Sequence, residues 1–401
     1  MIFFKPRVEF TLRNLLFDKN LKSTLKSWLI LFENPIKAFV LSFIIYFCLS
    51  FLKDVPWGVS KYPYFNFLAD AFLHGQMNLR LSPPSTHDLI LFENKLFLYW
   101  PPLPAILSMP FVSLFGINFS DILFTIFIGS INVGLLAIML RKTEIIFQPN
   151  LDEFKRAMLV LCFAFGSSYL ILVPTGTVWN TSIVIGVTCT LMMYLLALTK
   201  EGPLSFFLTG VAVSAAILTR MHLILVGIWP AWYLIFHHYA RPKKQLRRFI
   251  FIGILPILLT IILLGMYNFA RFGDVFEIGY RYHNMGIIFR SDYKNYGGFN
   301  LHYVPINFFY QYIAYPFLAK NPNQFFMGGS VFFLSPLFFG IFSCLKDKKN
   351  SISKYFLLIS ILFTSLPILL LMGTGFVQFG ARYTLDFIVP FMLLTSQGIK
   401  N

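Results

Sequence analysis

The chain has 401 residues, of which 57% are hydrophobic, 18% aromatic and only 12% charged. A soluble domain carries about 25% charged residues, whereas here uncharged stretches long enough to cross a hydrocarbon core recur along almost the whole length. The composition and the four isolated cysteines exclude a soluble enzyme, a disordered tail and a disulfide scaffold, and they predict an all-α polytopic membrane protein.

Residues 1–37 are predicted to form a cytoplasmic amphipathic segment. Leu21, Leu25, Trp28 and Phe32 recur at helical spacing, with lysines elsewhere around the helix. This pattern suits a helix on the membrane surface, and a solvated cytoplasmic helix is the alternative. No cleavable signal peptide is visible, so the first spanning helix is expected to act as an uncleaved anchor.

Residues 38–401 are predicted to form a single transmembrane domain of about ten helices. The 43 uncharged residues from 157 to 199 must contain two helices, and the break is expected at Pro174, Thr175 and Gly176. The predicted spans are 38–53, 120–140, 156–173, 178–199, 203–219, 221–239, 249–269, 328–345, 355–373 and 383–399.

The apolar segment 99–116 is short and carries four prolines. If it does not span, 22 Lys and Arg residues lie in the cytoplasm and 11 outside; if it spans, the counts become 14 and 19. The positive-inside rule favours the first arrangement. The segment is therefore predicted to be an interfacial or re-entrant helix on the outer face, and both termini are predicted to be cytoplasmic. On this topology the net charge of +16 reflects membrane orientation and not nucleic-acid binding.

Two long outer loops follow from this topology, at about 54–119 and 270–327. A helix should begin after Pro63 and end at Gly75. Asn66, Asp70 and His74 fall on one stripe of that helix, and the interpretation is a polar face turned toward water or toward a site. The opposite, apolar face comprises Phe65, Leu68 and Phe72.

Carboxylates in the first outer loop are the candidate general bases. Asp88 follows a proline-stiffened turn between the interfacial helix and the segment 99–116, and Asp54 lies just beyond the first span. A solvated turn aspartate is the alternative for Asp88. His87 beside it does not make a zinc site, because two adjacent residues are no ligand set.

A group of cationic and aromatic residues is predicted on the outer side, where a phosphate-bearing lipid would find guanidinium partners. Two of these arginines have an alternative structural role: the Arg220 side chain could extend to the membrane interface, and Arg382 could pair with Asp386. The candidate substrate-binding residues are Arg220, His222, Arg271, Tyr280, Arg382 and Tyr383, with Arg281 on the same side.

The sequence contains no recognisable nucleotide-binding motif. There is no phosphate-binding loop, no strand-linked GxGxxG, and no cytoplasmic loop long enough for a nucleotide-binding domain. No nucleotide, haem or nucleic acid is expected as a cofactor or partner, no metal ligand is assigned, and a divalent metal stays open.

The layout resembles the C-type membrane glycosyltransferase superfamily (GT-C), and the resemblance covers nearly the whole chain. It is carried by the long first outer loop and by three stretches: Leu68 to Gly75, Leu98 to Ala105, and Tyr267 to Gly273 with Gly279 and Tyr280. The second is similar to the proline-pair helix of aminoarabinose transferases and protein O-mannosyltransferases. Members usually carry a catalytic acid before the first interfacial helix, where this chain has Lys61 and Tyr62. The candidate bases are therefore ordered Asp88, Asp54 and Asp70.

The resemblance implies an inverting transferase in the cytoplasmic membrane, with its active face outward. An aspartate would accept the proton of the acceptor hydroxyl, and arginines would bind the phosphate of a polyprenyl-phosphate-linked sugar. The rival hypothesis is a non-catalytic carrier, transporter or scaffold of the same fold, which the missing acid at position 61 favours.

Overall fold

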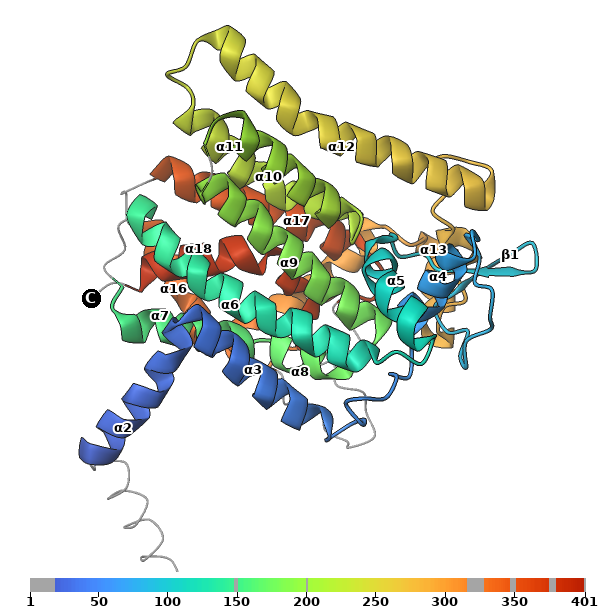
Figure 1. Cartoon of the computed structure of the whole chain (residues 1–401), viewed down its shortest axis with the longest axis horizontal. Helices are drawn as coiled ribbons and strands as arrows, with labels where there is room; N and C mark the ends of the chain where they lie inside the picture. Colours follow the sequence, from blue (N-terminus) through green and yellow to red (C-terminus); the bar gives the residue numbers. More distant parts are fainter. Residues whose placement is uncertain are drawn as a thin grey trace, which may run out of the picture.

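The structure is a computed structural model that describes residues 19–147, 151–199, 201–315, 328–346, 351–374 and 380–399. These residues are mostly helical, with one small two-stranded antiparallel sheet (Figure 1). The structure therefore agrees with the predicted helical class.

The helices form one bundle, and short elements gather beyond one of its ends (Figure 1). In the first half of the chain the elements are α2 (Lys19–Ile30), η1 (Leu31–Glu33), α3 (Pro35–Ser50), α4 (Tyr64–Leu73), β1 (Ile90–Phe92), β2 (Lys95–Phe97), α5 (Leu103–Phe115), α6 (Asp121–Phe147), α7 (Glu153–Phe165), α8 (Tyr169–Leu172), η2 (Val173–Thr175), α9 (Val178–Thr199) and α10 (Gly202–Ile217). In the second half they are η3 (Met221–Gly227), α11 (Ile228–His237), α12 (Lys243–Phe272), η4 (Tyr280–Tyr282), α13 (Ile287–Tyr296), η5 (Leu301–Tyr303), α14 (Val304–Phe308), η6 (Phe309–Ile313), α15 (Val331–Leu334), η7 (Pro336–Phe339), α16 (Gly340–Lys346), α17 (Ser351–Leu370), η8 (Arg382–Phe387) and α18 (Ile388–Gly398).

Four described helices are long and apolar enough to cross a membrane, and two bent pairs raise the number to six. The four are Asp121–Thr143, Val178–Thr199, Lys243–Phe272 and Ile352–Leu370. The other predicted spans fall on shorter helices: α10 has 16 residues, or about 24 Å of helix against a core of about 30 Å. The chain is thus a helical protein with several candidate spans, and the count of ten stays a prediction.

One sharp bend and one predicted break interrupt the helices, and local sequence explains each. Between η1 and α3 the axis turns by 109°, where the Asn34 side chain caps the amides of Ile36 and Lys37. The predicted break after η2 is confirmed, because Gly176 adopts a left-handed φ of +63°. A Cβ there would approach the Ile122 Cα to 2.6 Å, so glycine also permits this close packing.

The helix predicted after Pro63 is confirmed as α4, but its polar stripe is turned toward protein. Asn66 is fully buried and donates to the carbonyls of Ile117 and Phe119. Asp70 is 7% exposed and accepts two hydrogen bonds from Arg80. The interpretation of a face open to water or to a site was therefore wrong for these two residues, because neighbouring loops satisfy both polar groups.

The segment predicted as the first outer loop forms a compact layer at one end of the bundle, with α13 of the second predicted loop beside it. Figure 1 shows α4, α5, β1 and α13 together there, beyond the ends of α6 and α9. The hairpin pairs Ile90 with Phe97, and a hydrophobic cluster under it includes Leu68, Leu98 and Trp100. This layer and the rest of the described part of the second predicted loop, 270–315, lie next to the site described below.

The topology of this layer can be tested with single cysteines in a variant that lacks Cys48, Cys162, Cys189 and Cys344. Helix α5 has 13 residues, about 20 Å of helix, which is too short to span. Cysteines at the exposed positions Ser82 and Asn118 should therefore both react with an impermeant maleimide added to intact cells, while one at Lys244 is protected. Labelling of Ser82 with protection of Asn118 would make α5 a span and contradict the topology.

Candidate functional site

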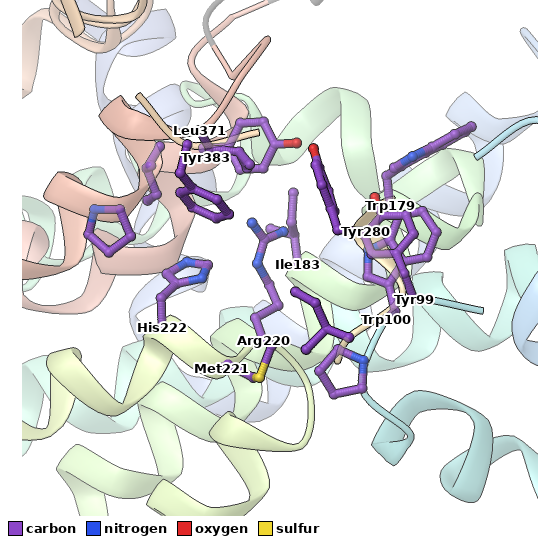
Figure 2. A pocket seen from close by; sticks show the side chains of 15 residues that line it. Tyr99, Trp100, Trp179, Ile183, Arg220, Met221, His222, Tyr280, Leu371 and Tyr383 are labelled. Carbon is purple, nitrogen blue, oxygen red and sulfur yellow. The ribbon is translucent and has the colours of Figure 1, made fainter. Parts of the chain in front are cut away.

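A cavity of about 210 Å³ lies where α9, η3, α17 and η8 meet the two outer loops (Figure 2). Its wall is mostly aromatic and aliphatic, and the basic side chains on it are Arg220 and His222. The lining residues are Tyr99, Trp100, Pro101, Trp179, Ile183, Arg220, Met221, His222, Ile278, Tyr280, Phe299, Pro367, Ile368, Leu371 and Tyr383.

Arg220 reaches the cavity because the chain is extended between two helices. Helix α10 ends at Ile217, and Arg220 has φ −154° and ψ 112° immediately before η3 begins. Figure 2 shows its guanidinium in the middle of the view, with His222 on one side and Tyr280 on the other. Its side chain is 10% exposed, so the charge is largely withdrawn from water.

Asp386 joins the two basic side chains. Its Oδ2 lies 3.0 Å from Arg220 Nη2 and 2.8 Å from His222 Nε2, and its side chain is 1% exposed. Its Oδ1 has no hydrogen-bond partner among the described residues. Asp386 thus pairs with Arg220 and His222, and the alternative pairing with Arg382 is not the one that forms.

Tyr383 lies between two guanidinium groups. The Cζ atoms of Arg220 and Arg382 are each 5.0 Å from its ring centroid, within the range of cation–π attraction. Arg382 Nη2 is 3.4 Å from the Tyr383 hydroxyl, and its buried Nε has no partner among the described residues. Arg382 itself does not line the cavity, although Tyr383 does.

Arg271 is placed differently from the other predicted phosphate ligands. It is 6% exposed, donates from Nη1 to the Leu98 carbonyl and from Nη2 to Asn268 Oδ1, and stacks 4.0 Å from the Tyr267 ring centroid. It is not among the cavity residues. By holding the Leu98 carbonyl, it fixes the segment that carries Tyr99 into the cavity wall.

Asp88 lies behind the aromatic wall of the cavity. It adopts a left-handed φ of +61°, which is uncommon for a residue other than glycine. Its amide donates to the Asn284 carbonyl, and the Asn284 amide donates to Leu89, so the two outer loops hold this conformation. The indole Nε1 of Trp179 donates to Asp88 Oδ2 at 3.0 Å, which links the carboxylate to the lining.

Two histidines face the same carboxylate. Asp88 Oδ1 is 3.6 Å from His87 Nε2 and 3.5 Å from His283 Nε2. His283 is buried, and neither of its ring nitrogens has a hydrogen-bond partner among the described residues. Burial lowers the pKa of His283, an effect that the charge of Asp88 opposes, so we expect a neutral imidazole at neutral pH.

Two phenols of the wall, Tyr99 and Tyr280, remain protonated. Burial raises the pKa of Tyr99 and of Tyr280 well above the ordinary value for tyrosine, and the nearby Asp88 carboxylate adds to the effect. His283 stacks on Tyr280 with ring centroids 5.4 Å apart and packs edge-on against Tyr99 at 4.8 Å. The wall therefore offers neutral hydroxyl donors with fixed ring planes.

The other two candidate bases lie apart from the cavity. Asp54 is exposed in the turn that follows α3. Asp70 is committed to Arg80, with Nε–Oδ2 at 2.9 Å and Nη2–Oδ1 at 3.0 Å. Of the predicted residues, the structure brings Arg220, His222, Tyr280 and Tyr383 to the cavity. Asp88 is linked to the cavity wall by its hydrogen bond from Trp179, and four predicted residues lie outside the lining: Asp54, Asp70, Arg271 and Arg382.

Two residues of this region had no assigned role. Trp179 joins Asp88 to the cavity, and His283 packs between Asp88 and the tyrosines. The sequence signal for Trp179 was its place at the second position of a helix that follows a proline and glycine break. No local signal marks His283, because its partners are distant in sequence.

Among the described residues, no group of three or more His, Cys, Asp or Glu side chains is arranged to hold a metal ion. Comparisons of the chain with protein-family models, with curated proteins and with solved structures find no match. The functional proposal therefore depends on the chemistry of the cavity and of the groups around it.

Proposed function

We propose that this protein is a membrane glycosyltransferase that moves a sugar from a polyprenyl-phosphate donor to an acceptor. The observation that carries the proposal is an aromatic cavity with Arg220 and His222 on its wall, both paired with Asp386. Asp88 accepts a hydrogen bond from Trp179, which lines the same cavity. A cation, a set of ring faces and a carboxylate are the three groups that such a transfer requires.

The phosphate of the donor binds at Arg220 and His222. A guanidinium forms charge-assisted hydrogen bonds to phosphate, and these gain strength where water is excluded. Arg382 lies on the far side of Tyr383 and adds positive charge to the same region. Its buried Nε and that of Arg220 lack partners among the described residues, so each keeps a donor for which a phosphate oxygen is a suitable acceptor.

The sugar binds against the aromatic wall. The carbon–hydrogen faces of a sugar ring pack on aromatic rings, and the neutral phenols of Tyr99 and Tyr280 are available as hydrogen-bond donors to its hydroxyls. Trp100 stacks on Tyr99 with ring centroids 3.6 Å apart, which gives that wall a fixed orientation. A rigid wall orients the anomeric carbon at little entropic cost.

Asp88 accepts the proton of the acceptor hydroxyl. Trp179 engages Oδ2, so Oδ1 is free of hydrogen bonds from the described residues. The acceptor then approaches between the two outer loops. Both termini lie in the cytoplasm, and the cavity faces the outer side of the cytoplasmic membrane.

The test uses the purified full-length chain in lipid nanodiscs. Undecaprenyl-phosphate-linked glucose, mannose and galactose are supplied one at a time with a membrane extract as the source of acceptor. Release of free undecaprenyl phosphate, measured by mass spectrometry, is the expected result with at least one donor. Binding of every donor without release would favour a carrier, and absence of binding would contradict both functions.

A non-catalytic carrier of the same lipid-linked sugar is the second candidate, and one observation favours it. No carboxylate is among the fifteen residues drawn lining the cavity. Asp386 is neutralised by Arg220 and His222, and Asp88 reaches the cavity only through Trp179. A carrier needs the cation and the aromatic wall but no base.

A further inference from the structure

The cavity contains a histidine–aspartate pair whose partners come from opposite halves of the fold. His222 on η3 and Asp386 on η8 are 164 residues apart in sequence, and their side chains meet at 2.8 Å. Asp386 is 1% exposed, whereas His222 is 21% exposed and lines the cavity. The carboxylate is therefore sealed inside the protein, and the imidazole is the member of the pair that a ligand can touch.

The hydrogen bond determines which ring nitrogen is left for a ligand. Asp386 Oδ2 can only accept, so His222 donates to it from Nε2–H. His222 Nδ1 has no hydrogen bond to the described residues and is not among their buried polar atoms that lack a partner. When the ring is protonated, Nδ1–H is a charged donor that Asp386 does not occupy.

We propose that His222, oriented by Asp386, is the acid that protonates the departing lipid phosphate, and that Asp386 is its positioning residue. This inference rests on the proposed function. It adds the source of the proton that the leaving phosphate receives. The bond between the anomeric carbon and the phosphate oxygen breaks, and its electron pair passes to that oxygen. The acceptor oxygen forms the new bond to the anomeric carbon and gives its proton to Asp88.

The charge change on the phosphate explains why an acid is useful there. The donor is a phosphodiester with one negative charge, and the leaving group is a monoester whose second ionisation falls at a pKa of about 6. The Nδ1 proton of His222 passes to the phosphate oxygen that was bonded to the anomeric carbon, so the phosphate leaves as a monoanion. One proton is gained by Asp88 and one is lost by His222, and exchange with water restores both.

The surrounding charges allow Asp386 to act in this way. The charged and titratable groups around the pair are Arg220 just before η3 and Arg382 and Tyr383 on η8, with Tyr99 and Tyr280 across the cavity. The cavity-lining parts of α9 and α17 add no titratable group. Asp386 shares one oxygen between Arg220 and His222, so it holds both phosphate-binding groups in one geometry.

The experiment compares His222→Gln, Asp386→Asn and Asp386→Glu with wild type in nanodiscs. His74→Gln is the matched control, because His74 follows the last residue of α4 and its side chain is 51% exposed. With the donor that wild type uses, His222→Gln should lower kcat about 100-fold with KM changed less than about threefold, and it should remove the alkaline limb of the pH profile. Asp386→Asn should show the same altered profile, and Asp386→Glu should recover part of kcat. His74→Gln should match wild type.

A binding measurement separates this proposal from the proposed function. Undecaprenyl phosphate is titrated into each protein at about pH 6 and about pH 8, with tryptophan fluorescence as the readout. The second ionisation of the ligand, at a pKa of about 6, changes its charge in both titrations, so the readout is the ratio of the affinity at the lower pH to the affinity at the higher pH. This ratio should be larger for wild type than for His222→Gln. Equal pH dependence in wild type and His222→Gln, or an unchanged kcat in the variant, overturns the role of His222. If wild type releases no lipid phosphate from any donor, the transferase function and the proton transfer are both contradicted. A pH dependence that still differs between wild type and His222→Gln would support the imidazolium–phosphate contact alone.

Discussion

Replacing Asp88 with Asn is expected to lower turnover of the lipid-linked sugar by about 100- to 10,000-fold, the usual contribution of a general base. The amide keeps the shape of the side chain and can still accept from Trp179 Nε1, so the cavity should remain intact. Binding of undecaprenyl phosphate should therefore stay within about threefold of wild type, because this ligand contacts the cation end of the cavity. The measurement is release of free lipid phosphate beside the binding titration.

Glu93→Gln is the matched control for this variant. Glu93 lies in the same outer loop, is exposed, and also has a positive φ, of +49°. Its substitution should leave turnover unchanged. Full activity of Asp88→Asn would remove Asp88 as the base, and loss of activity in Asp54→Asn alone would transfer that role to Asp54.

Replacing Arg220 with Met should have the largest combined effect on binding and stability. The guanidinium is the cation proposed to bind phosphate, so affinity for undecaprenyl phosphate should fall at least about tenfold. Its loss also leaves Asp386, which is 1% exposed, with His222 as its remaining partner. Breaking a buried ion pair by removal of one member costs about 3 kcal/mol or more, so the thermal midpoint in detergent should fall clearly.

The paired substitution separates these two effects. Arg220→Met combined with Asp386→Leu removes both charges, and replacement of a buried ion pair by apolar residues is often neutral for stability. The double variant should regain most of the thermal midpoint and remain unable to bind undecaprenyl phosphate. Recovery of binding in the double variant would show that Arg220 is structural and not a phosphate ligand.

Features that depend on a few neighbouring residues were predictable from sequence. The helix after Pro63 and the break at Gly176 both follow from the backbone preferences of proline and glycine, and both are present. The number of spans was less accessible. Ten apolar stretches are visible in the sequence, but α10, α11 and α18 are shorter than a straight crossing requires, and helix length depends on how the ends pack.

The site could be predicted only in part, because its pairings are long-range. Arg220 and His222 were recognisable as costly charges near a span, but nothing local indicated that Asp386 would join them from 164 residues away. Trp179 and Asp88, which are also in contact, lie 91 residues apart in the sequence. Arg271 could not be distinguished by sequence from the other predicted phosphate ligands. In the structure it donates to Leu98 and Asn268 and lies outside the cavity lining.

The most direct test of the central claim is to locate a lipid phosphate on the protein. A photoreactive polyprenyl phosphate is cross-linked to the full-length chain in nanodiscs, and adducts are mapped by mass spectrometry with undecaprenyl phosphate or undecaprenol as competitor. The account predicts adducts on the segments that carry Tyr99, His222 and Tyr280, removed by undecaprenyl phosphate but not by undecaprenol. Adducts confined to the exposed face of α12, or equal competition by the uncharged alcohol, would contradict it.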